Sequence, residues 1–185
     1  MPYPRLRLLA LAGLGLLAGC ATGSYSINMP ISGGRTVPLE LTAGGMVHGE
    51  NDDFRIDAAV YQFDPKVKNG TYLFAFLVKK GGTPRSVKVD DVTDDEPTNL
   101  YQTDQIKVQD GHWKQRTESF VPDQQNLKWV FEIENSIRVY RFTIVTADGR
   151  TDVLYEGCNY LGFLKELIRK SLADNAPAAP PAATP

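Results

Sequence analysis

The stretch TYLFAFLV, residues 71–78, decides the fold class of this chain. In an extended strand, successive side chains point to opposite faces of the sheet. One face of this stretch carries Phe74 and Phe76, and the other face carries Leu73 and Ala75. A strand that is apolar on both faces is typical of a position covered on both sides. We therefore expect residues 71–78 to form a central strand.

Further strands are predicted on either side of this stretch. Apolar and polar residues alternate, fully or in part, over residues 54–60, 85–92, 127–133, 140–145 and 151–156. Their predicted inward faces include Phe54, Ile56, Ala58, Val60, Tyr140, Phe142 and Ile144. Residues 112–120 are mostly polar and charged, which indicates an edge strand. Asn69-Gly70 and Asp148-Gly149 supply the positive φ angles of hairpin turns. This pattern predicts a mainly β fold, an antiparallel β-sandwich of immunoglobulin-like or transthyretin-like architecture.

The spacing of apolar residues changes near the C-terminus. Apolar residues at helical spacing, including Leu164 and Ile168, predict an amphipathic helix at about 160–173. Asn159 is placed to serve as its N-cap. We expect Leu164 and Ile168 to pack on the sheet. Residues 174–185 are almost entirely alanine and proline, which predicts a disordered tail.

The N-terminus has the layout of a secretory signal. Arg5 and Arg7 precede an unbroken run of apolar residues and glycines at 8–18. This run is shorter than the about 20 residues that a transmembrane helix needs. It ends at Leu17-Ala18-Gly19-Cys20, which resembles the lipobox of bacterial lipoprotein signal peptides. The alternative is an ordinary secretory signal with an incidental cysteine.

The lipoprotein resemblance covers about the first 20 residues and implies how this end is processed. Residues 1–19 would be removed as a signal peptide, and Cys20 would carry a diacylglycerol thioether and an N-acyl chain. Residues 20–25 would then form a short tether, and residues 26–173 a single domain. The residue after the cysteine is Ala21 and not the aspartate of inner-membrane members. This implies the outer membrane, facing the periplasm, if the host is Gram-negative.

Charge and cysteine content narrow the classes of partner. The 185-residue chain has a net charge of −2, and losing the first 19 residues with their two arginines leaves 166 residues at −4. A mildly acidic chain argues against nucleic acid or anionic lipid as the main partner. Cys158 is the one cysteine besides Cys20, so we expect no disulfide within the domain. We expect no cofactor apart from the covalent lipid.

Two features are candidate binding sites. The carboxylates of the densest acidic run could supply oxygen ligands to calcium, although their spacing does not match an EF-hand. They are Asp90, Asp91, Asp94, Asp95 and Glu96. A solvated strand end is the alternative interpretation of this run. Trp113, beside a predicted turn, is a candidate contact for a protein or glycan partner, and a singly exposed aromatic residue is the alternative.

The candidate residues for catalysis match no known arrangement. His48 and His112 are the two histidines of the chain, and they lack a metal-ligand spacing. Cys158 precedes the predicted helix, whose dipole could activate a thiol paired with His112. We instead expect Cys158 to be a small buried residue at the junction of sheet and helix.

No nucleophile elbow and no phosphate-binding loop occurs in the sequence. We therefore expect no catalytic residues. The sequence predicts a lipid-anchored, non-catalytic binding or assembly module of the bacterial cell envelope, with a protein or glycan partner. The alternative is an envelope hydrolase that uses Cys158 or a metal ion held by the histidines and acids.

Overall fold

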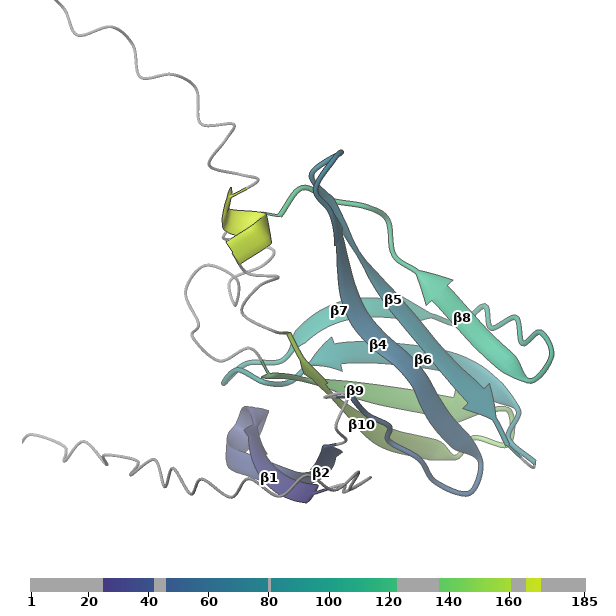
Figure 1. Ribbon diagram of the computed structural model, residues 1–185. Helices are drawn as coiled ribbons and strands as arrows, with labels where there is room; N and C mark the ends of the chain where they lie inside the picture. Colours follow the sequence, from purple (N-terminus) through teal and green to yellow (C-terminus); the bar gives the residue numbers. More distant parts are fainter. Residues whose placement is uncertain (1–24, 42–45, 80, 123–136, 161–165, 171–185) are drawn as a thin grey trace, which may run out of the picture.

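The structure is a computed structural model that describes residues 25–41, 46–79, 81–122, 137–160 and 166–170 (Figure 1). The fold of these residues is mainly β, with antiparallel sheets and one short α-helix at 166–170. The strands are β1 (Tyr25–Ile31), β2 (Arg35–Leu41), β3 (Met46–Val47), β4 (Phe54–Asp64), β5 (Asn69–Val78), β6 (Pro84–Asp91), β7 (Thr98–Thr103), β8 (His112–Arg116), β9 (Ile137–Thr146) and β10 (Thr151–Asn159). The predicted strand at 127–133, the lipobox cysteine Cys20 and the tail at 174–185 lie outside the described residues.

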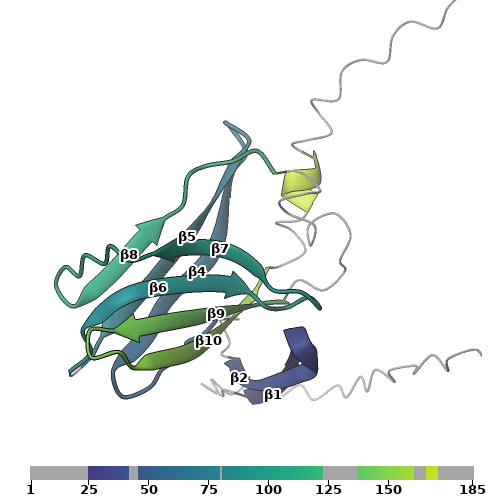
Figure 2. The same ribbon diagram turned by 180° about the vertical axis from the view of Figure 1, so that it is seen from behind.

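The strands form three sheets, and the two larger ones enclose the core. The five-stranded sheet has the order β3-β10-β9-β6-β7, the three-stranded sheet β4-β5-β8, and β1 pairs with β2. Seen from the front and from behind, the two larger sheets face each other (Figures 1 and 2). Phe74 of β5 makes edge contacts with Tyr140 and Phe142 of β9, with ring centroids 6.4 Å and 6.0 Å apart. These aromatic contacts hold the sheets together.

The central position predicted for residues 71–78 is confirmed, because β5 pairs with β4 on one side and β8 on the other. Phe74 and Phe76 are fully buried. Ile168 of the short helix is also fully buried and belongs to the same core cluster, as predicted. Leu164, its predicted neighbour on the helix face, lies outside the described residues.

A β-bulge in β4 reverses the predicted alternation. The register of β4 against β5 shifts between Ile56 and Ala58, so one extra residue lies in β4 at this point. Beyond the bulge the buried residues are Ala59 and Tyr61. The predicted inward positions of Ala58 and Val60 are therefore wrong. A strict alternation counts Asp57 like any other residue, but Asp57 has no partner residue on β5.

The hairpin between β4 and β5 exists, but its turn does not lie at Asn69-Gly70 as predicted. Both residues already pair with β4, and the turn occupies residues 65–68. Lys68 supplies the left-handed conformation with a φ of 58°. Gly70 serves a different purpose, because a side chain there would overlap the ring of Tyr61.

Two other local predictions are confirmed. The turn between β9 and β10 contains Asp148 and Gly149, and Gly149 has a φ of 86°. The polar segment that begins at His112 forms β8, at the edge of the three-stranded sheet. Turn chemistry and edge charges are local signals, which explains why the sequence was sufficient to place them.

The start of the C-terminal helix differs from the prediction. Asn159, the predicted N-cap, is the last residue of β10, and Tyr160 has no helical backbone. Helical backbone is described only at 166–170. Asn159 still pairs with Ile137 of β9. The strand β10 therefore includes the residue that the sequence placed at the N-terminus of the helix.

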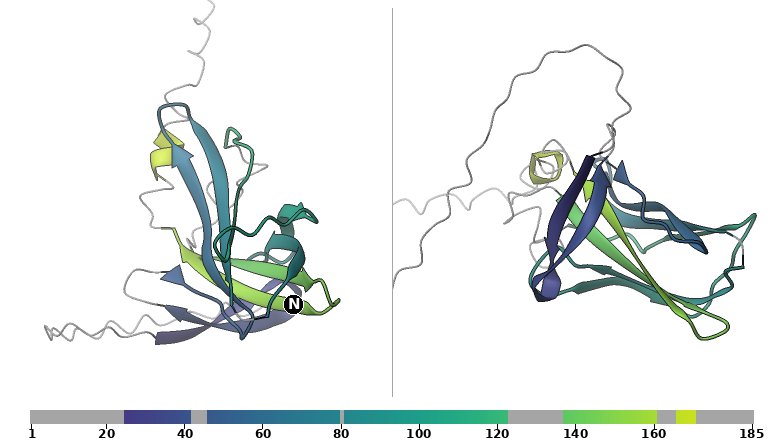
Figure 3. Two further views of the ribbon diagram at one scale, coloured as in Figure 1. Left: turned by 90° about the vertical axis from the view of Figure 1, so that its right-hand side faces the viewer. Right: turned by 90° about the horizontal axis from the view of Figure 1, so that it is seen from below.

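The N-terminal hairpin of β1 and β2 packs on the outer face of the five-stranded sheet. Ile31, Val37 and Leu39 cluster there with Val92 and Val139. Since Val139 precedes the inward-facing Tyr140 on β9, its side chain points away from the main core. The right-hand view of Figure 3 shows the hairpin beside β10. This placement forms one side of the groove described below.

Candidate functional site

The first three acids of the run at the end of β6, Asp90, Asp91 and Asp94, are paired with basic side chains, so this part of the run is not the solvated strand end of the alternative interpretation. Asp90 and Asp91 are 1% and 4% exposed. Arg141 of β9 donates to Asp90 at 2.7 Å, and Nζ of Lys88 lies 3.0 Å from the other carboxylate oxygen. Burial raises the pKa of Asp90, but hydrogen bonds led by the one from Arg141 outweigh it, so the pKa falls below its ordinary value.

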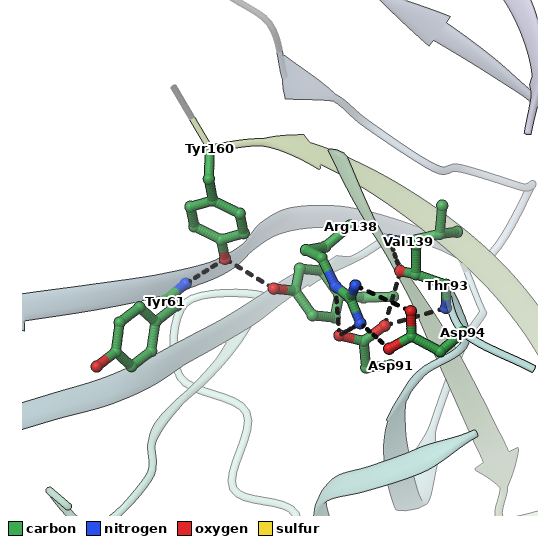
Figure 4. Close-up of polar contacts among 8 residues, drawn as sticks. Tyr61, Asp91, Thr93, Asp94, Arg138, Val139 and Tyr160 are labelled. Carbon is green, nitrogen blue, oxygen red and sulfur yellow. Dashed lines mark hydrogen bonds and ion pairs between the residues drawn. The ribbon is translucent and has the colours of Figure 1, made fainter. Parts of the chain in front are cut away.

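Arg138 of β9 joins the next two carboxylates (Figure 4). Its Nε donates to Asp91 at 2.9 Å, and its Nη2 donates to Asp94 at 2.7 Å. The other oxygen of Asp91 accepts bonds from the backbone and the hydroxyl of Thr93. That hydroxyl accepts in turn from the amide of Val139 at 2.7 Å. The run therefore ties β6 to β9.

These contacts already occupy three of the five candidate calcium ligands, Asp90, Asp91 and Asp94. A calcium ion at Asp91 and Asp94 would have to displace the guanidinium group of Arg138, which is 3% exposed. The remaining acids of the run, Asp95 and Glu96, are exposed. Within the described residues, no three His, Cys, Asp or Glu side chains are placed to hold a metal ion together.

Trp113 lies in the core and not on the surface that a partner contact requires. Its side chain is 3% exposed, and its ring stacks on Phe76 with centroids 4.9 Å apart. The polar neighbours of Trp113 face outward, so the mostly polar segment hid one inward position. In the described part of the chain, the large apolar side chains that are exposed are all valines, namely Val67, Val108, Val121 and Val153.

Cys158 is a buried residue of β10, as expected. It is 6% exposed, and burial raises the pKa of its thiol to about 11. A thiol with this pKa is protonated at neutral pH and is a poor nucleophile. These properties do not favour the alternative in which Cys158 attacks a substrate.

Each histidine is paired with a carboxylate of its own. Nδ1 of His112 lies 2.8 Å from Asp57, which also accepts from Arg55 at 2.9 Å. Nδ1 of His48 lies 3.3 Å from Oε1 of Glu156. Asp57 lies at the bulge in β4, and Glu156 is the fourth residue from the end of β10, in a largely apolar part of that strand. Among these groups, Glu156 is the one to consider as a site, because its carboxyl group is buried and has a raised pKa.

Glu156 is the more unusual of the two carboxylates. It is 1% exposed, on the same face of β10 as the buried Leu154 and Cys158. Its Oε2 accepts from the amide of Gly49 at 2.9 Å, whereas no group of the described residues donates a hydrogen bond to its Oε1. Burial raises the pKa of Glu156 to about 8, against the effect of the Gly49 bond and with a further rise from Asp57. At neutral pH this carboxyl group is therefore mainly protonated.

Gly49 connects Glu156 to the three-stranded sheet. Its amide donates to Glu156, and its carbonyl accepts from the amide of Ile56 at 2.8 Å. A side chain at Gly49 would overlap the carbonyl of Tyr155, so the close approach to β10 requires glycine. The chain thus crosses from one sheet to the other directly over the buried carboxyl group.

A groove of about 450 Å³ opens beside this crossing. Its walls come from β2, from the residues after β3 and from β10. They are Val37, Pro38, Leu39, His48, Gly49, Glu50, Val153, Leu154 and Tyr155. His48 lines the groove, and its Nδ1 lies 3.3 Å from Oε1 of Glu156. Val153 is 44% exposed here.

One faint signal for Glu156 is present in the sequence. It alternates with Leu154 and Cys158, which places an acid on an apolar face of β10. Val153 and Tyr155 make the opposite face apolar too, so the alternation does not say which face is inward. His48 is 108 positions away and shares no motif with Glu156, so pairing of the two follows only from the fold.

The comparisons with known proteins identify no relative of this chain. No protein-family model matches the chain, and no curated protein or solved structure is significantly similar to it. Within the described residues, no helix has the length and apolar character needed to cross a membrane.

Proposed function

We propose that the protein is a lipid-anchored component of the bacterial cell envelope that acts as a non-catalytic binding or assembly module. The anchor rests on the lipobox-like sequence that ends at Cys20. The fold of the module is proposed to be a β-sandwich of immunoglobulin-like or transthyretin-like architecture, supported by the two facing antiparallel sheets. In a Gram-negative host, Ala21 favours the outer membrane.

The groove beside β10 is the observation that carries the binding role. It combines an exposed valine, Val153, with the buried Val37 and Leu39 at its wall. We propose a polypeptide as its occupant, since apolar pockets of this kind accept side chains of protein partners. A glycan contact has less support, because Trp113 is buried and the exposed large apolar residues of the described part are valines.

The alternative function, an envelope hydrolase, finds no specific support in the described contacts. The thiol of Cys158 is buried and has a raised pKa. His48 and His112 pair with separate carboxylates and do not share a ligand set. A binding role does not require Cys158, His48 or His112 to be reactive.

Cross-linking in intact cells tests the binding role. A photo-cross-linker at the exposed Pro38, on the wall of the groove, is expected to capture one defined polypeptide. Val153→Asp should abolish that product by placing a charge in the groove. Val108→Asp is the matched control, because Val108 is 41% exposed and Val153 44%. Equal products in both variants, or none in the parent, would rule out the groove as the binding surface.

Fatty-acid labelling tests the anchor separately. Labelled palmitate should enter the parent protein and not the Cys20→Ser variant, because lipid attachment requires the thiol. The domain of the variant should stay folded, since Cys20 precedes the first strand. Equal labelling of the two proteins would show that Cys20 is not the site of acylation.

A further inference from the structure

The edge of β10 that faces away from β9 presents unused backbone groups. In an antiparallel ladder, successive residues direct their N–H and C=O groups alternately toward the partner strand and away from it. The bond from the amide of Thr146 to the carbonyl of Arg150 fixes this alternation for β9 and β10. Counting along β10, the backbone groups of Leu154 face β9, so those of Val153 face the opposite edge.

The strand that covers this edge turns away before it reaches Val153. β3 pairs with β10 at Gly157 and Cys158. The chain then crosses toward the three-stranded sheet at Gly49, whose carbonyl accepts from the amide of Ile56. Within the described residues, no hydrogen bond engages the outward N–H or C=O of Val153. One donor and one acceptor are therefore open at the edge of the sheet.

The groove runs along this open edge. Three consecutive residues of β10, at positions 153–155, line it, although their side chains alternate between the two faces of the sheet. A groove that follows the backbone edge accounts for this lining. Residues 37–39 of β2 form one wall, and residues 48–50 of the crossing segment form the other. The edge of β10 lies between the two walls.

The open part of β10 lacks the features that protect other edges in this protein. β8, at the edge of the three-stranded sheet, carries Lys114 and Arg116. Pro38, on the wall opposite β10, has no backbone N–H, so β2 is a poor template for pairing. Val153 is uncharged and 44% exposed. An exposed, uncharged strand edge is a template for a further strand.

We propose that the groove binds an extended segment of the partner polypeptide, which adds to the edge of β10 as a strand and continues the pairing that β3 begins. This inference rests on the proposed function, because it names how the partner binds at the same groove. In an antiparallel addition, one partner residue donates its N–H to the carbonyl of Val153 and accepts from the amide of Val153.

This pairing restricts the partner residue opposite Val153. Its side chain lies on the outward face of the sheet, beside the side chain of Val153 and toward the wall formed by β2. An apolar, β-branched residue suits that position, because such residues pair well across strands. Proline is excluded there, since it has no N–H to donate.

N-methylated peptides test the inference on the full chain in detergent micelles. Acetyl-Thr-Thr-Val-Thr-Thr-amide should bind, as measured by calorimetry. Methylation of the valine nitrogen should weaken binding by about tenfold, because it removes the donor to Val153 and leaves that carbonyl unpaired. Methylation of the nitrogen of the next threonine is the matched control and should have little effect, since that N–H points away from β10.

Amide hydrogen exchange locates the contact. In the free protein, the amide of Val153 should exchange faster than the amide of Leu154, which is bonded to β9. The peptide should slow exchange at Val153. The variant Val153→Pro removes the edge donor and should bind the peptide about tenfold more weakly than Val153→Ala, which keeps the donor and loses most of the side chain.

Four outcomes would overturn the inference. They are slow exchange at Val153 in the free protein, absence of peptide binding, equal weakening by the two methyl groups, and equal binding to Val153→Pro and Val153→Ala. The first three are measured on the parent protein and do not depend on folding of a variant. Capture at Pro38 that Val153→Asp abolishes would still support the proposed function in that event, with the contact made by side chains alone.

Discussion

The hydroxyl oxygens of Tyr140 and Tyr160 lie 2.7 Å apart in the core, between the two larger sheets. Tyr160 also accepts a hydrogen bond from the backbone amide of Tyr61 at 2.6 Å (Figure 4). Its hydroxyl therefore links β4, β9 and the residue that follows β10. Both tyrosines have pKa values raised well above normal, chiefly by burial, so they act as neutral hydrogen-bonding groups.

This arrangement predicts unequal costs for removing the two hydroxyl groups. Tyr160→Phe strands both the hydroxyl of Tyr140 and the amide of Tyr61, and should lower the free energy of unfolding by about 2–4 kcal/mol. Tyr140→Phe leaves Tyr160 bonded to Tyr61, and should cost about 1 kcal/mol. Urea denaturation measures both values. Equal costs for the two variants would contradict the geometry.

Arg138 provides a test of the buried ion pair. Arg138→Met leaves Asp91, which is 4% exposed, without its cation, and should cost about 3–5 kcal/mol. Arg150→Met is the matched control, because Arg150 pairs with Asp53 and Asp148 at an exposed position, where solvent screens the ion pairs, and should cost much less than Arg138→Met. Thermal denaturation compares them. A near-neutral Arg138→Met would show that the carboxylates are solvated after all.

Glu156 predicts a characteristic dependence of stability on pH. Its pKa is about 8 in the folded protein and 4.5 as the ordinary value. The folded state therefore binds more protons between these values. The stabilisation is complete below pH 4.5 and is lost as the pH rises through 8, with a slope of up to about 1.4 kcal/mol per pH unit.

Glu156→Gln should remove that slope, since the amide group does not titrate. Urea denaturation of the parent and the variant at pH 5, 6, 7, 8 and 9 measures the difference between the two curves. Glu118→Gln, at an exposed site, should leave the slope intact. Parallel curves for the parent and Glu156→Gln would show that the carboxyl group titrates normally.

Phe74 tests the contact between the sheets. It is fully buried and contacts rings of Tyr72, Tyr101, Tyr140 and Phe142. Phe74→Ala should cost about 3–5 kcal/mol, because the lost transfer energy is joined by the cost of a cavity. Val108→Ala, at a 41% exposed position, should cost less than about 1 kcal/mol. A melting temperature of Phe74→Ala within a degree of the parent would contradict the core assignment.

The sequence was informative where one strand or one turn carries the signal by itself. The double apolar face of 71–78 identified the central strand, and Asp148-Gly149 identified a turn. Alternation failed at the bulge beside Asp57, because a bulge is defined by the partner strand and not by the bulged one. The prediction that Trp113 is exposed failed for a related reason. One inward apolar residue on a polar edge strand does not produce a recognisable alternation of apolar and polar residues.

The candidate site depended on contacts between distant parts of the chain. Asp90 and Asp91 look like solvated acids until Arg141 and Arg138 of β9 are placed beside them. Nothing local to Glu156 indicates that Gly49 donates to it. Periodicity reports which residues share a face, but which faces meet depends on sheet order, and that order is decided by the whole chain.

The order of the five-stranded sheet also bears on when this chain can fold. Its β3 pairs with β10, and the neighbouring contact of Gly49 with Glu156 joins positions 107 residues apart. Pairings of this kind form slowly, because a long loop must close before they contribute. Of the early strands, β3 must wait for β10, and one side of β6 must wait for β9, whereas β1 with β2 and β4 with β5 can pair at once. Until these late strands are made, the open edges of β3 and β6 need protection from aggregation.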